Sequence, residues 1–111
     1  MIEITRGDTA QFKFQRKDND GNPILSVATK VYFTIKKHYS FSNFVLQKTI
    51  DDMTFDEDGY YHFTINPQDT NELSFGEYEY DIEVIVDDYK QTISKGVFKI
   101  TKEVTHANNE V

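Results

Sequence analysis

The chain has 111 residues and a mass of 13.0 kDa, which is the size of one domain. It contains no cysteine, so disulfides, thiol nucleophiles and cysteine-ligated zinc are excluded. The formal net charge of −7 argues against nucleic acid as a partner, because phosphate binding requires clustered Lys and Arg. No apolar run approaches the roughly 18–20 residues of a membrane span. We therefore expect a soluble acidic domain without nucleic-acid or membrane partners.

Three strands are predicted in the first part of the chain, where apolar and polar residues alternate. They cover Ile2–Thr5, Thr9–Arg16 and Lys30–Lys37. The segment Asp18–Pro23 is rich in turn-forming residues and connects the second strand to the third. Ile24 and Leu25 are expected to close one end of the core.

The middle of the chain continues the same alternation. A strand is predicted over Phe44–Ile50, an acidic hairpin turn follows, and Tyr61, Phe63 and Ile65 form the next inward-facing set. Asn66–Leu73 predicts a single helical turn, with Asn66 as its cap and Pro67 as its first helical residue.

Two further strands are predicted near the end of the chain. Tyr78–Val86 places apolar residues on one face and carboxylates on the other. The last strand runs over Tyr89–Ser94 and Val97–Thr101, with a break near Lys95–Gly96 that is typical of a bulge. Residues 103–111 are polar and lack periodicity, so we expect a flexible tail after a domain that covers residues 1–102.

Tyr78 begins a late strand just after a corner that contains Leu73 and Gly76. This arrangement resembles the tyrosine corner of Greek-key sandwiches. We expect its hydroxyl to bond back to the backbone of Asp69–Leu73 and to lock the fold. Short strands at this spacing predict an all-β sandwich.

No pattern in the sequence predicts catalysis or a metal site. Five carboxylates lie within Asp51–Asp58, where calcium or a solvated turn would both explain them, and the turn is favoured. The acidic row Glu77–Glu83 has the period of an exposed strand face, which could pair with lysines such as Lys36 or Lys95. His38, His62 and His106 are far apart in the sequence, so zinc ligation is not predicted. We expect a non-enzymatic protein without cofactors.

The loop His38–Phe44 is the most distinctive surface feature of the sequence. It contains Tyr39, Phe41 and Phe44, and rings in loops either anchor interfaces or cap one end of a sandwich. Tyr32 and Tyr60 are outward-facing rings that could stack on sugars, as could Tyr39.

Seven segments of the sequence form a recognisable series: ITRGDTAQFKF, DGNPI, VYFTIKK, QKTI, DGYYHFTINPQDTNEL, GEYEYDIEV and ISKGVFKITKEVT. Taken together, they resemble small proteins from phage and prophage structural-gene regions of low-GC Gram-positive bacteria. They are also similar in layout to the immunoglobulin-like N-terminal domain of baseplate upper proteins. The resemblance implies an immunoglobulin-like antiparallel β-sandwich of seven to eight strands.

The same resemblance implies a virion-associated structural or assembly module of a tail, baseplate or head, made in the bacterial cytoplasm. Its partners would be other virion or prophage proteins, and it would form homo-oligomers through edge strands. Ile2–Thr5 and Val97–Thr101 are the edges that the sequence favours. The alternative is a carbohydrate-binding or adhesion module, against which the lack of Trp counts.

Overall fold

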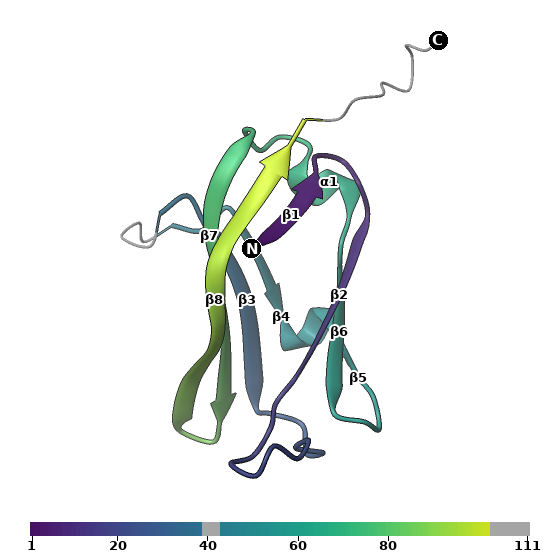
Figure 1. Cartoon of the computed structure of the whole chain (residues 1–111), viewed down its shortest axis with the longest axis vertical. Coiled ribbons are helices and arrows are strands. Elements are labelled where there is room, and N and C mark those ends of the chain that lie inside the picture. The colour runs from purple at the N-terminus through teal and green to yellow at the C-terminus, as the bar shows by residue number, and fades with distance from the viewer. Residues whose placement is uncertain (39–42, 103–111) are drawn as a thin grey trace.

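Two β-sheets pack face to face in the computed structural model, which describes residues 1–38 and 43–102 (Figure 1). The larger sheet contains, in order across it, β1 (Ile2–Thr5), β8 (Tyr89–Thr101), β7 (Gly76–Val86), β3 (Lys30–Lys36) and β4 (Leu46–Thr49). The smaller sheet contains β2 (Ala10–Gln15), β6 (Tyr60–Ile65) and β5 (Thr54–Phe55). The short helical elements are η1 (Ile50–Asp52) and α1 (Pro67–Thr70). The all-β sandwich class predicted from the sequence is confirmed.

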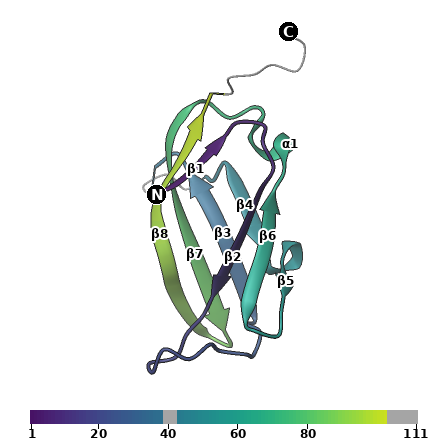
Figure 2. The same cartoon turned by 45° about the vertical axis from the view of Figure 1, so that its right-hand side comes forward.

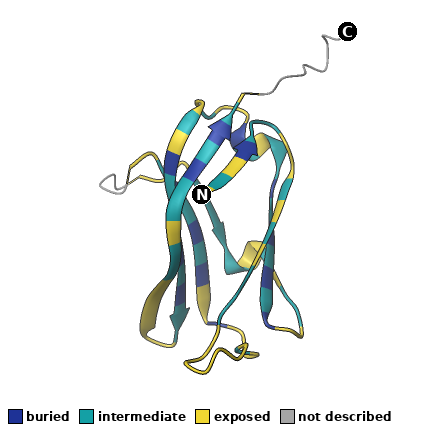
Figure 3. Ribbon diagram, viewed as in Figure 1, coloured by how far each residue is buried: buried dark blue, intermediate teal, exposed yellow. Residues whose placement is uncertain are grey.

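The core lies between the two sheets, where alternate residues of each strand face inward (Figure 3). Phe33 of β3 and Phe63 of β6 meet across the interior with ring centroids 4.8 Å apart. Fully or almost fully buried residues from both sheets surround them: Val31, Ile35, Tyr61, Ile65, Val84, Phe98 and Ile100. This inward packing agrees with the alternation read from the sequence.

β1 pairs with β8 in parallel, which corrects the expectation of a purely antiparallel sandwich. The pairing places Phe98–Thr101 between β1 and β7, so the prediction that Val97–Thr101 forms a free edge is wrong. β1 itself lies at the edge of its sheet, as expected. Figures 1 and 2 both show it beside one end of β8 only.

β8 is one continuous strand, so the predicted break near Lys95–Gly96 is wrong. The irregularity lies instead at Ile93, because Ser94 pairs with Ile82 and Thr92 pairs with Glu83. Gly96 has another role, since a Cβ atom there would lie 3.3 Å from the ring of Tyr80. The glycine therefore leaves room for a cross-strand aromatic ring.

Other differences from the prediction are local. Leu25 is 62% exposed and does not close the core; Ala28, which donates its amide to the Tyr61 hydroxyl at 2.9 Å, is buried there instead. β4 begins two residues later than predicted, and Ile50 belongs to η1. The helical turn predicted after Asn66 is confirmed as α1. The predicted tail, residues 103–111, lies outside the described residues.

The part of the chain that the structure describes contains no helix with the length and apolarity needed to cross a membrane.

Candidate functional site

A shallow hollow of about 320 Å³ lies on the outer face of the larger sheet. We call it the sheet hollow. Two aromatic rings and several polar groups line it: Tyr32, Thr34, Lys36, Phe44, Gln47, Asp81 and Glu83. Of the five surface aromatics that the sequence singles out, Tyr32 and Phe44 are brought together here.

Strand register explains why these side chains meet. Tyr32 lies opposite Glu83 of β7, and Thr34 lies between Gln47 of β4 and Asp81 of β7. Since neighbouring residues in register point to the same face of a sheet, these residues form one outward patch. The Gln47 Nε2 group donates a 3.1 Å hydrogen bond to Thr34 Oγ1, which fixes the floor of the hollow.

Phe44 is the most exposed ring of the hollow, at 52% of its surface. It lies two residues before the start of β4, and the intervening Val45 donates its amide to the carbonyl of Ile35 at 2.8 Å, which ties this segment to β3. Tyr39 and Phe41, the other two rings of the predicted loop, lie outside the described residues.

Asp81 is surrounded by charged side chains on this face, and its pKa is shifted. Burial raises the pKa of its carboxyl above the ordinary value, and the charge of Glu83 raises it further, while Lys36, Lys90 and Lys95 act in the opposite direction. The hollow therefore combines aromatic surface with a carboxyl group that is costly to ionise.

Lysines lie opposite the acidic row of β7, as the sequence suggested. Register places Glu77 beside Lys99, Glu79 beside Lys36 and Asp81 beside Lys95. Lys90 forms a 3.5 Å ion pair with Glu83. Each of the four carboxylates of this row therefore has a lysine close to it on the same sheet face.

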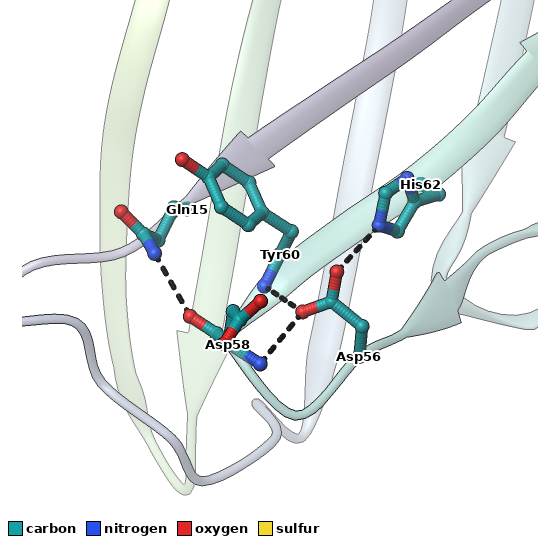
Figure 4. Close-up of polar contacts among 5 residues, drawn as sticks. All are labelled: Gln15, Asp56, Asp58, Tyr60 and His62. Atoms are coloured by element: carbon teal, nitrogen blue, oxygen red, sulfur yellow. Dashed lines mark hydrogen bonds and ion pairs between the residues drawn. The ribbon is translucent and has the colours of Figure 1, made fainter.

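Tyr60 lies on the smaller sheet, away from Tyr32 and Phe44. The Lys13 Nζ atom is 4.4 Å from the centre of its ring, a cation–π arrangement. Beside it, the turn after β5 is held by side-chain bonds (Figure 4). Gln15 donates to the Asp58 carbonyl at 2.8 Å, and Asp56 accepts from the amides of Asp58 and Tyr60, each at 2.9 Å.

The other oxygen of Asp56 lies 2.8 Å from His62 Nε2 (Figure 4). This hydrogen bond, followed by the amide of Tyr60, lowers the pKa of Asp56. Both residues line a groove of about 700 Å³ that also contains Lys48. Lys48 is itself held by a 2.8 Å ion pair to Asp69. Asp56 and His62 are therefore engaged with each other, and Lys48 is engaged with a carboxylate outside the groove lining.

Two carboxylates of the acidic segment, Asp52 and Asp56, form local hydrogen bonds. Asp52 accepts the Thr49 amide at 2.9 Å, and Asp56 organises the next turn as described above. Among residues 1–38 and 43–102, no three His, Asp or Glu side chains are placed to share a metal ion.

The tyrosine corner is built from neighbouring backbone. The Tyr78 hydroxyl donates a 2.7 Å bond to the carbonyl of Ser74, one residue beyond the predicted segment Asp69–Leu73. Gly76 has a φ of 124°, a conformation open to glycine and strained for other residues. Leu73 packs partly buried against the core. Together they turn the chain from α1 into β7.

No protein-family model matches the sequence, and curated proteins show no significant sequence match. A solved structure with a similar fold is the endo-beta-1,4-mannanase from Thermotoga petrophila. The similarity has a TM-score of 0.61 at 15% identity and covers 92% of this chain. The chain matches only 18% of the length of that enzyme. The likeness concerns the fold alone.

Proposed function

We propose that this protein is a non-enzymatic structural or assembly module of a phage or prophage particle, and that it acts through protein–protein contacts. The sheet hollow is the contact site in this proposal. The main support for this contact is that Phe44, a half-exposed ring, lines the same hollow as Tyr32 on the outer face of the sheet. Aromatic rings of this kind supply most of the binding energy of many interfaces.

We also infer an immunoglobulin-like sandwich. The strand order β1-β8-β7-β3-β4 against β2-β6-β5 supports it, because immunoglobulin-type folds divide their strands between two sheets in this way. The Tyr78 bond to Ser74 adds support, since a tyrosine that bonds back upstream is typical of such folds. The resemblance of seven sequence segments to phage and prophage proteins supports the assignment to a virion.

The proposed contact joins copies of this chain through β4 and the sheet hollow beside it. Among the described residues β4 is the last strand of its sheet, so its outer backbone groups are open to pairing, except the Thr49 amide, which bonds to Asp52. Gln47 lies on β4 and lines the hollow, while Phe44 lies just before the strand. A neighbouring subunit that paired with β4 and also overlapped the outer face of the sheet would cover the rings of Phe44 and Tyr32.

Sedimentation equilibrium at increasing protein concentration tests this proposal. We expect self-association that Phe44→Ser abolishes. Phe75→Ser is the matched control, because Phe75 is 42% exposed and lies in the corner before β7, outside the hollow. A wild-type protein that stays monomeric at millimolar concentration, or identical loss in both variants, would overturn the proposed contact.

Carbohydrate binding is the second candidate function. The specific observation in its favour is that the ring of Tyr32 lies beside Gln47, Asp81 and Glu83, a set that could stack on a sugar and bond its hydroxyls. The mannanase with a similar fold acts on a polysaccharide, and a mannan oligosaccharide is therefore the first ligand to test. A blank glycan array, with unchanged Tyr fluorescence on mannan addition, would remove this candidate.

A further inference from the structure

β8 is much longer than the strand that covers its outer side. β1 pairs only with Phe98–Thr101, so among the described residues no strand lies against the outer edge of residues 89–95 (Figure 1). Backbone N–H and C=O groups on such an edge are open to pairing with another chain. We call residues 89–95 the open edge.

An apolar groove of about 260 Å³ lies beside the open edge, at the seam between the two sheets. Phe12 and Phe14 of β2 line one side, and Ile93 and Ser94 of β8 line the other. Phe33 of the core forms part of its wall. A side chain placed here would therefore contact the hydrophobic core directly.

β1 shows which kind of strand fits this edge. Its inward residues, Ile2 and Ile4, lie opposite Phe98 and Ile100. Its outward residue, Glu3, is exposed and lies opposite Lys99. Apolar side chains thus face the seam, and a carboxylate faces outward beside a lysine.

The pairing of a carboxylate with a lysine of β8 is complete beside β1 but incomplete beyond it. Lys99 has Glu77 of β7 on one side and Glu3 of β1 on the other. Lys95 has Asp81 of β7 on one side, but β1 does not reach its other side. Although the chain carries a net charge of −7, neither β8 nor β2 contains an acidic residue. An acidic side chain beside Lys95 would therefore complete the row.

We propose that the open edge accepts an extended strand from another protein. This strand runs parallel to β8, in line with β1, with apolar side chains toward the groove and a carboxylate beside Lys95. A second copy of β8 is a poorer occupant, because its lysines would meet Lys90 and Lys95. The bulge at Ile93 disfavours indiscriminate pairing, so side-chain complementarity decides what binds. The proposed function does not depend on this inference.

Titration of the ¹⁵N-labelled full chain with a blocked peptide of alternating Glu and Ile, flanked by Ser, tests the proposal by NMR. We expect amide shifts in residues 89–95 and in β2, and at least about tenfold weaker binding when Lys replaces every Glu. Salt should weaken the Glu peptide's binding. Shifts confined to other strands, equal affinity for both peptides, or no binding at millimolar concentration would overturn it.

Variants of Lys95 connect the affinity to the proposed contact. Lys95→Glu should weaken binding of the Glu peptide about tenfold and Lys95→Gln should weaken it less, since only the first adds repulsion. Lys30→Glu, an exposed lysine at the start of β3, is the control with the same charge change and should bind as the wild type does. Equal losses in Lys95→Glu and Lys30→Glu would contradict a local charge contact. If Lys95→Glu does not fold, Lys95→Gln still tests the contact, because it removes the positive charge without adding a negative one.

Discussion

The hydroxyl of Tyr78 donates a 2.7 Å hydrogen bond to the carbonyl of Ser74, four residues earlier in the chain. The ring is almost fully buried, and Lys37 Nζ lies 4.5 Å from its centre. The bond holds the corner between α1 and β7 against the core. Because β7 lies between β3 and β8, this corner also positions the strand that carries Asp81 and Glu83.

Loss of this bond should be measurable. Tyr78→Phe should lower the free energy of unfolding by about 1 kcal/mol, the net value of a typical hydrogen bond, because the ring stays but the Ser74 carbonyl loses its donor. Urea unfolding followed by circular dichroism measures the change. Tyr89→Phe, which removes the hydroxyl of a ring that is 70% exposed, should have little effect. Equal stability of the wild type and Tyr78→Phe would show that the corner does not stabilise the fold.

Asp81 should destabilise the folded protein when it is ionised. Its folded-state pKa is raised, so its contribution is most favourable at low pH and is lost as the pH rises through that pKa. Asp81→Asn should therefore increase the free energy of unfolding at pH 7 by roughly 0.5 kcal/mol, a small value because solvent screens a half-exposed group. The gain should vanish near pH 3.

Unfolding curves at both pH values check this prediction. Glu77→Gln, on the same strand but more exposed, removes one carboxylate without the burial and should give no gain. A gain that is equal at pH 3 and pH 7 would mean that ionisation of Asp81 is not its cause.

Asp56 should show the opposite dependence on pH. Its folded-state pKa is lowered, so the stability it contributes is present at neutral pH and is lost as the pH falls through that lowered pKa. Asp56→Asn should lower the melting temperature at pH 7, and the difference from the wild type should shrink in acid. Melting curves at several pH values between about 2 and 7 measure this difference, because carboxyl groups titrate within that range. Glu57→Gln in the same turn is the control. A difference that stays constant with pH would rule out this role of the carboxylate.

The alternation of apolar and polar residues was sufficient to predict β3, β6 and β7, because each has one face in the core. The helical turn α1 was predicted from a different signal, namely Asn66 as a cap and Pro67 as the first helical residue. The parallel pairing of β1 could not be predicted this way. It depends on residues that are far apart in the sequence, and a short strand such as Ile2–Thr5 has the same pattern whichever way it pairs.

The predictions for Gly96 and Leu25 were wrong for a different reason. A glycine inside a strand indicates a bulge when only local backbone is considered, yet here it leaves room for the Tyr80 ring of the neighbouring strand. Leu25 is apolar, but it lies in a loop whose exposed position no pattern reveals. In both cases the deciding contacts are tertiary.

The sheet hollow was only partly predictable. Tyr32 and Phe44 stood out as surface rings, but the pattern of a single strand cannot tell that they share one hollow. Gln47 and Asp81 appeared only as outward strand positions, because register between β3, β4 and β7 brings them together. Tyr60 has the same outward pattern and belongs to the other sheet.

Hydrogen–deuterium exchange at two protein concentrations tests the central claim most directly. If copies associate through the sheet hollow and β4, amides in residues 43–49 and in β3 should exchange more slowly in the concentrated sample. Amides of the turn between β5 and β6, which carries Asp56, should exchange at the same rate in both samples. Phe44→Ser should remove the concentration dependence. Identical exchange of β3 and β4 at both concentrations would contradict the proposed contact.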